Sequence, residues 1–110
     1  MKKYVIWLDD VRPIPEEIDH SRCIWYITAE GMIKDLAEIN RYFNEIDYIS
    51  LDNDLGQNCL EGYQVLDWLE SLQIPIPFGI HIHTANPVAR ERMRAIIQRN
   101  GWKEINNINY

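Results

Sequence analysis

The chain has 110 residues, of which 46% are hydrophobic and 11% aromatic, enough to build the core of one domain spanning residues 1–110. Its formal net charge of −6 argues against a broad nucleic-acid-binding surface, because such surfaces neutralise phosphates with cations. No window approaches the roughly 20 apolar residues of a membrane span, and the N-terminal residues contain no cleavage site. We therefore expect a soluble, unprocessed, cytoplasmic protein without a membrane partner.

The two cysteines, Cys23 and Cys59, lie far apart and form no CxxC or Cys/His pattern. Neither a disulfide framework nor a zinc site is indicated by this spacing. We expect two free thiols.

The first strand is predicted over residues 4–8, a continuous apolar run that suits a strand buried on both faces of a parallel sheet. It ends at Asp9 and Asp10. Because Pro13 and Pro15 prevent a regular helix from starting before residue 15, the segment that follows has room for only a short helix, ending near His20.

A second strand is predicted over residues 23–28 and a third over 46–51, ending at Asp52. Between them, apolar side chains recur at helical spacing in a segment of good helix formers. These side chains are Ile33, Leu36, Ile39, Tyr42 and Phe43.

Residues 61–72 carry an apolar stripe at helical spacing, formed by Val65, Leu66, Leu69 and Leu72. Prolines then end this helix, and residues 78–84 read as the fourth strand. Asn86 and Pro87 are a capping residue and a first-turn proline, so they predict a helix that buries Ala89, Met93, Ile96 and Ile97. That helix should stop at Gly101. A last strand is expected within 102–108.

Strands alternating with helices predict an α/β fold with a doubly wound, five-stranded parallel sheet, right-handed crossovers and helices on both faces. In such sheets ligands bind beyond the carboxyl ends of the strands. The polar clusters of this chain follow three strand ends. They are Asp9 and Asp10, Asp52 and Asp54, and His83, Thr84 and Asn86.

Carboxylates gathered at one crevice repel one another unless a hard cation binds them. We therefore predict that Asp9, Asp10, Asp52 and Asp54 hold a divalent metal, with Mg²⁺ as the first choice and Mn²⁺ as the alternative. A second interpretation is that Asp9 and Asp54 merely cap the turns in which they lie.

His83 lies at the end of its strand, within reach of the acids, where a histidine can act as general acid or base near neutral pH. A packed, hydrogen-bonded structural role is the alternative. His81 shares the face of His83 but lies one step deeper, so a structural role is expected there. His20 is expected at the surface.

The N-terminus of the helix that begins after Asn86 attracts anions through its dipole and free amides. Arg90 lies one turn into this helix, and Arg12 follows the first acidic pair. Both arginines are candidates for holding a phosphate against the metal, with Thr84 and Asn86 as neighbours. An ion pair with a nearby carboxylate is the alternative for each.

An acidic pair after strand one, an aspartate after strand three and a hydroxyl residue after strand four resemble the receiver domains of two-component signalling. In those domains the aspartate that corresponds to Asp52 accepts a phosphoryl group. This chain departs from them because it has no lysine at the end of strand five, where Asn106 and Asn107 stand, and because it lacks a fifth helix.

The sequence resembles more closely the cyclic-phosphate-processing receiver family, which is common in bacteria and phages. The matching segments are 8–13 (LDDVRP), 52–56 (DNDLG), 61–63 (EGY) and 83–90 (HTANPVAR), with Met93 following. Asn53 stands where the family often has histidine, and Ala89 where it often has glycine. The resemblance implies a receiver-like, flavodoxin-like fold with an abbreviated first helix.

The same resemblance implies a metal-dependent phosphodiesterase that acts on a cyclic phosphate of a nucleotide or RNA end. Asp9, Asp10, Asp52 and Asp54 would then hold the metal, and His83 would transfer a proton. Arg12, Asn86 and Arg90 would orient the phosphate. Two alternatives remain: a module that sequesters a phosphorylated nucleotide without turnover, and a signalling receiver that is phosphorylated on Asp52.

Overall fold

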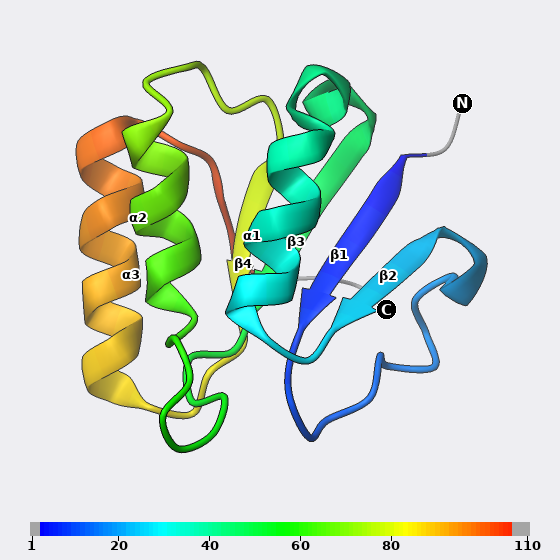
Figure 1. The fold of residues 1–110 in the computed structure, drawn as a ribbon, viewed down its shortest axis with the longest axis vertical. Coiled ribbons are helices and arrows are strands. Elements are labelled where there is room, and N and C mark those ends of the chain that lie inside the picture. The colour runs from blue at the N-terminus through cyan, green and yellow to red at the C-terminus, as the bar shows by residue number, and fades with distance from the viewer. Residues whose placement is uncertain (1–2, 107–110) are drawn as a thin grey trace.

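The structure is a computed structural model that describes residues 3–106 (Figure 1). Its five parallel strands form one sheet in the order β2-β1-β3-β4-β5. The strands are β1 Tyr4–Leu8, β2 Cys23–Tyr26, β3 Ile46–Leu51, β4 Gly79–Ile82 and β5 Glu104–Ile105. The helices are α1 Ala29–Glu38, α2 Tyr63–Ser71 and α3 Pro87–Asn100, with the 3-10 helices η1 His20–Arg22 and η2 Asn40–Glu45. The predicted parallel α/β sheet is confirmed; residues 107 and 108 of the expected last strand lie outside the described residues.

The helix ends follow the capping chemistry of the sequence. Asn86 accepts hydrogen bonds from the amides of Val88 and Ala89, each at 3.1 Å, so α3 begins at Pro87 as predicted. It ends at Gly101, whose positive φ of 67° is a left-handed conformation that favours glycine. Thr28 caps α1 by accepting from the amide of Gly31 at 3.0 Å. The helical pattern that follows Thr28 divides into α1 and η2 instead of forming one helix.

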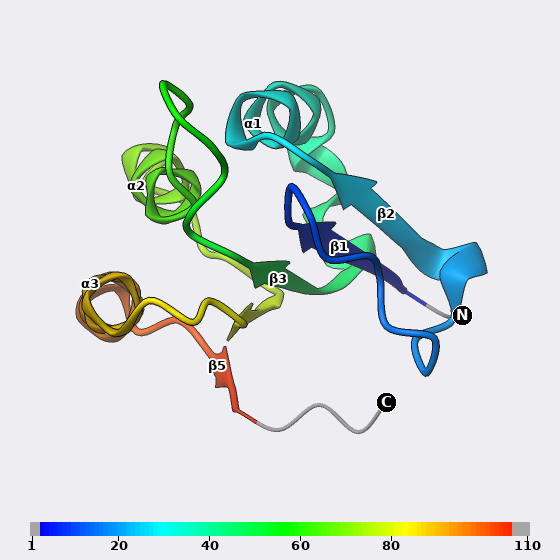
Figure 2. The ribbon, with the colours of Figure 1, turned by 90° about the horizontal axis from the view of Figure 1, so that it is seen from below.

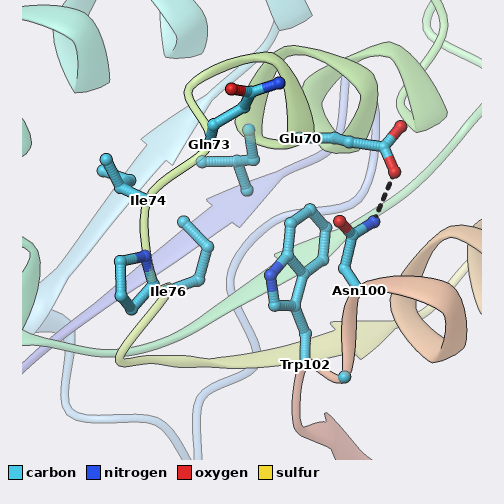
Figure 3. A pocket seen from close by; sticks show the side chains of 9 residues that line it. Glu70, Gln73, Ile74, Ile76, Asn100 and Trp102 are labelled. Atoms are coloured by element: carbon cyan, nitrogen blue, oxygen red, sulfur yellow. Dashed lines mark hydrogen bonds between the residues drawn. The ribbon is translucent and has the colours of Figure 1, made fainter.

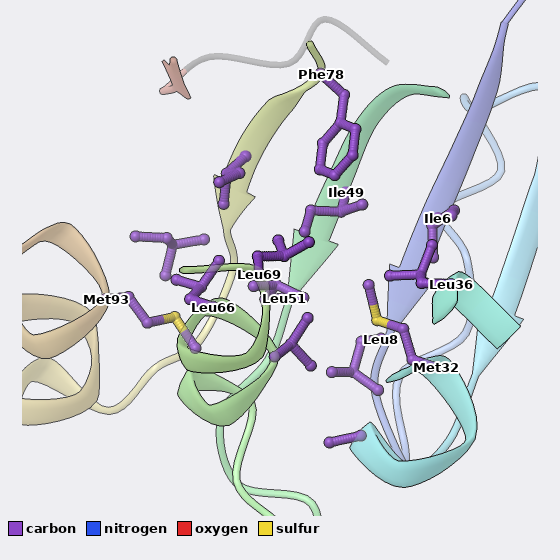
Figure 4. Packing of buried hydrophobic residues seen from close by; sticks show 14 of the residues in the cluster. Ile6, Leu8, Met32, Leu36, Ile49, Leu51, Leu66, Leu69, Phe78 and Met93 are labelled. Atoms are coloured by element: carbon purple, nitrogen blue, oxygen red, sulfur yellow. The ribbon is translucent and has the colours of Figure 1, made fainter. Parts of the chain in front are cut away.

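All three α-helices lie on one face of the sheet (Figure 2). The core forms between them and alternate residues of the strands, including Ile6 and Leu8 of β1 and Ile49 and Leu51 of β3 (Figure 4). α3 contributes Met93, which is fully buried as predicted. The helix-covered face therefore holds the main apolar cluster.

The opposite face is crossed by the segment of residues 9–22, which contains turns and η1 but no α-helix (Figure 2). The expectation of helices on both faces is wrong for this reason. Pro13 and Pro15 limit helix formation here, and the turn around Asp9 takes up the start of the segment. The path is still doubly wound, because this first crossover passes over one face and the later crossovers pass over the other.

Candidate metal centre at the strand ends

Three aspartates meet where β1 and β3 end. Asp9 and Asp10 follow β1, Asp52 follows β3, and the Asp52 amide donates to the Leu8 carbonyl at 3.0 Å, which aligns the two strand ends. Each aspartate offers one carboxylate oxygen, and these three oxygens all lie within 4.8 Å of one another. Asp9 and Asp52 are only 1% and 7% exposed, and Asp10 is the most open of the three. The structure thus brings together three of the four predicted acids.

The spacing of these oxygens fits a hard divalent cation. Oxygen ligands lie about 2.1 Å from Mg²⁺ and about 2.3–2.6 Å from Ca²⁺, so two ligands on opposite sides of one ion are roughly 4–5 Å apart. The three carboxylate oxygens lie within 4.8 Å of one another, so one ion can reach all of them. Asp9, Asp10 and Asp52 are therefore the residues that can hold a cation here.

The two carboxylate oxygens of Asp9 contact different partners. Its Oδ1 accepts from the amides of Val11 at 2.9 Å and Arg12 at 2.8 Å, so Asp9 does cap the turn after β1. Its Oδ2 lies 3.1 Å from Nε2 of His83 and 3.9 Å from Nε of Arg12. Turn capping and site formation are thus compatible, because they use different oxygens.

Burial is the main cause that raises the pKa of Asp52 above its usual value, and the charge of Asp9 raises this pKa further. Hydrogen bonds from the Asn53 amide and the Thr84 side chain, together with the charge of Arg12, lower the pKa but do not cancel the rise. The ionised form of Asp52 is therefore destabilised in the protein alone. A cation bound between the acids would remove this penalty.

His83 follows β4 on the helix-free face of the sheet, and its ring contacts Asp9. Its Nε2 faces Asp9, its Nδ1 lies 2.7 Å from Oγ of Ser50, and its ring stacks on Trp7 with centroids 4.1 Å apart and planes 5° from parallel. Burial lowers the pKa of His83 to about 4 even though the hydrogen bond and charge of Asp9 favour protonation. His83 is therefore neutral at pH 7. Its predicted reach to the acids is seen in its contact with Asp9.

Asp54 and Asn86 form the outer rim of the site. Asp54 is exposed and does not belong to the three-acid group; its carboxylate oxygens lie 3.5 Å from Nδ2 of Asn86. Because Oδ1 of Asn86 caps α3, that residue links the helix start to Asp54. Thr84 is buried, and its side chain hydrogen-bonds to Asp52.

The two candidate arginines occupy different surroundings. Arg12 has a side chain that is 57% exposed and lies beside Asp9, so its guanidinium can reach an anion at the acidic cluster. Arg90 is half-buried and donates to the Thr84 carbonyl at 2.5 Å, which ties α3 to the end of β4. Its partner is therefore a backbone oxygen, where the sequence suggested a phosphate or a carboxylate.

Four residues of the site were missed at the level of sequence. Ser50 and Trp7 contact His83, and the indole Nε1 of Trp25 donates to the Asp9 carbonyl at 2.6 Å. Gly62 lies so close to the Asp52 carbonyl that a Cβ there would overlap it. Strand alternation places Ser50 and Trp7 on the face of His83, so their proximity had a signal in the sequence. Gly62 belongs to the matching segment 61–63, but that match did not predict its close approach to Asp52.

A cavity of about 510 Å³ is lined by none of the three aspartates of the cluster. Figure 3 shows the side chains that line it. It is lined by residues that precede β4 and β5, including Ile74, Ile76 and Trp102, and by Glu70 and Asn100, which hydrogen-bond to each other at 2.6 Å. Because it lies toward the start of these strands, it is at the opposite edge of the sheet from Asp9 and Asp52. It is a separate feature from the acidic cluster.

A parallel sheet in the order β2-β1-β3-β4-β5, with acids beyond β1 and β3, defines an α/β protein with a receiver-like fold. The family model of the cyclic-phosphate processing receiver domain matches residues 4–99. The chain therefore belongs to that family, as its motifs indicated.

A comparison with solved structures shows a similarity of fold only. A solved structure in which the yeast Spc42 trimeric coiled coil, amino acids 181–211, is fused to another protein aligns with 87% of this chain at a TM-score of 0.60 and 14% identity. The aligned part spans 64% of that fused chain. No curated protein gives a significant match. Among the described residues, no helix has the length and apolarity needed to cross a bilayer.

Proposed function

We propose that this protein is a metal-dependent phosphodiesterase that opens a cyclic phosphate on a nucleotide or an RNA end. The observation that carries the proposal is the cluster of Asp9, Asp10 and Asp52, whose carboxylate oxygens lie within 4.8 Å of one another in a member of the cyclic-phosphate processing family. These three residues would hold Mg²⁺ or Mn²⁺, ions that prefer carboxylate oxygens. Asp54, at the rim, would complete the acidic edge.

A bound divalent cation would polarise a phosphoryl oxygen and make an attacking water more acidic. The side chain of Arg12 is free to turn toward a phosphate, because more than half of it is exposed beside Asp9. Asn86 and Thr84 lie just before α3, where the helix dipole favours an anion, although the amides of Val88 and Ala89 already donate to Asn86. Arg90 would keep this helix start in place through the Thr84 carbonyl.

His83 is proposed to fix the Asp9 carboxylate by donating a hydrogen bond to it. The sequence suggested a general acid, but a pKa of about 4 leaves little imidazolium at pH 7. A histidine that orients a metal-binding carboxylate typically changes metal affinity or activity by about 10–100-fold when removed. The proposed role therefore predicts a partial loss of activity in variants of this residue.

One observation favours a second candidate, a module that binds a phosphorylated nucleotide without turnover. Both ring nitrogens of His83 have partners within the protein, so the buried site presents no unoccupied imidazole nitrogen for proton transfer. A binding module would need the cation and Arg12 but no proton-transfer group. The two candidates differ in whether product forms.

A hydrolysis screen distinguishes them. Wild-type protein would be incubated with Mg²⁺ or Mn²⁺ and with 2′,3′- and 3′,5′-cyclic nucleotides or RNA ends carrying a 2′,3′-cyclic phosphate, and the products separated by chromatography. We expect turnover that is abolished in Asp52→Asn and reduced about 10–100-fold in His83→Ala. Glu91→Gln, which removes one charge from an exposed position on α3, is the matched control.

Two outcomes of the screen, and one outcome of a separate labelling experiment with acetyl phosphate, would change the assignment. Binding of an intact nucleotide without product would support the sequestering module. Stable labelling of Asp52 by acetyl phosphate, with no hydrolysis, would support a phosphoacceptor. Turnover that survives in Asp52→Asn would contradict the site itself.

A further inference from the structure

The register of β3 and β4 places Ser50 between two histidines. Ser50 is directly opposite His81 in the parallel pairing, and His83 lies two residues further along β4 on the same face. The Ser50 Oγ lies 2.7 Å from Nδ1 of His81 and 2.7 Å from Nδ1 of His83. One hydroxyl therefore serves two imidazole rings.

His81, Ser50, His83 and Asp9 form a chain of hydrogen bonds. The position of each proton in this hydrogen-bond chain follows from which atoms can donate. An ionised carboxylate oxygen only accepts hydrogen bonds, so Nε2 of His83, 3.1 Å from Oδ2 of Asp9, carries the proton. In the neutral ring Nδ1 is then an acceptor, and the Ser50 hydroxyl must donate to it. Because a hydroxyl has a single proton, His81 must donate from Nδ1 to the Ser50 oxygen.

The opposite order is unfavourable. If Ser50 donated to His81, then His83 would have to donate from Nδ1, and its unprotonated Nε2 would face the oxygen of Asp9, lone pair against lone pair. This order applies to the neutral ring of His83, whose side chain is only 8% exposed.

Burial and ring stacking hold the members of the hydrogen-bond chain in place. Ser50 is fully buried, and the side chain of His83 is only 8% exposed and stacked on Trp7. Burial of a hydroxyl or an imidazole without a hydrogen-bond partner is costly, so each member of the chain stabilises the orientation of the next. Asp9 stands at the end of this chain.

We propose that Ser50 and His81 are positioning residues, which lock His83 as the Nε2–H tautomer and thereby orient the Asp9 carboxylate in the acidic cluster. The importance of this orientation for turnover rests on the proposed function; the tautomer order does not. His81 thus has a defined part in the site, in addition to the structural role expected from its sequence position.

The test is nitrogen NMR of the histidine rings in the wild-type protein, in which two-bond proton–nitrogen correlations report which nitrogen carries the proton. His20→Gln assigns the signals of the surface histidine. We expect His83 to be protonated at Nε2 and His81 at Nδ1. Protonation of neutral His83 at Nδ1 would overturn the proposal, whatever the enzyme assays show.

Variants then test the consequence for the cluster. Ser50→Ala should give His81 a mixture of tautomers and weaken Mn²⁺ binding, measured by titration calorimetry, by about tenfold. Ser50→Thr, which restores a hydroxyl, should recover much of the lost affinity, and His81→Phe should mimic Ser50→Ala. Unchanged tautomers and unchanged Mn²⁺ affinity in a folded Ser50→Ala protein would refute the positioning role.

The metal titration also separates this inference from the proposed function. Wild-type protein that shows the expected tautomers but binds no Mn²⁺ would retain the hydrogen-bond order, while overturning both the metal site and the positioning role in it. Expected tautomers, Mn²⁺ binding and no turnover would retain the positioning role and refute only the phosphodiesterase.

Discussion

Replacing Asp52 with asparagine should stabilise the protein when no divalent cation is present. The three carboxylate oxygens lie within 4.8 Å of one another. At that upper limit, two unit charges repel by about 1 kcal/mol in water and about 3.5 kcal/mol at an effective dielectric constant of 20. Asp52→Asn removes the repulsion from Asp9 but weakens hydrogen bonds from the Asn53 amide and the Thr84 side chain. We expect the free energy of unfolding to rise by about 1–2 kcal/mol.

The assay is thermal unfolding in EDTA and in a series of Mg²⁺ concentrations. For a chain of this size each kcal/mol corresponds to about 4–8 °C in the melting temperature. Wild-type protein should gain stability with Mg²⁺, by about 2.7 kcal/mol at one hundred times the dissociation constant, whereas Asp52→Asn should gain little. Glu91→Gln, which removes an exposed charge of the same sign, should behave like wild type.

The pH dependence checks the same reasoning. The pKa of Asp52 is raised above its ordinary value of 3.8, so the folded protein binds this proton more tightly than the unfolded chain does. Without metal, the penalty is fully present above the raised pKa and is relieved as the pH falls toward 3.8. Asp52→Asn should lack this gain. A variant that is less stable than wild type in EDTA, or that responds equally to Mg²⁺, would refute the account.

Further predictions concern the rest of the fold. Gly62→Ala should destabilise the protein by about 3 kcal/mol in urea unfolding because its Cβ would overlap a backbone carbonyl, whereas Gly101→Ala, in open space at positive φ, should cost about 1 kcal/mol. Hydrogen bonds to an arginine and an asparagine lower the pKa of Glu70 to about 2. The stability that these bonds provide should therefore be lost as the pH falls from 4.5 through 2. Glu70→Gln should lack that loss in thermal unfolding measured over a series of pH values. Burial raises the pKa of Cys23 to about 11, so iodoacetamide at pH 8 should label exposed Cys59 first by mass spectrometry; equal labelling would contradict this.

Local sequence signals predicted much of the fold. The apolar runs before Asp9 and Asp52 define β1 and β3, and the Asn86 cap and Gly101 define the bounds of α3. The lack of helical cover on the second face was harder to anticipate. Prolines show that the first crossover is short. The alternation of strands and helices along the sequence does not by itself say what covers the helix-free face, to which Trp7 points.

Some features of the candidate site could also be predicted from the sequence, and others could not. Because carboxyl ends of adjacent parallel strands meet at one edge, the grouping of Asp9 with Asp52 could be inferred from sequence. The place of Asp54 beside Asn86 depends on the path of a loop, which the motif does not encode. The Ser50 hydrogen bonds depend on the register between β3 and β4, and that register is set by the packing of the whole sheet.

The assembly of the acidic cluster from β1 and β3 has a consequence for folding. About 40 residues, including all of β2 and α1, separate Asp9 from Asp52 in the chain, although the strands that carry them are neighbours. A nascent chain that ends before β3 therefore contains only one side of the cluster. A cation that needs ligands from both strands can bind only after the two strands have paired. Its binding therefore stabilises the completed sheet and not the partly folded chain that precedes it.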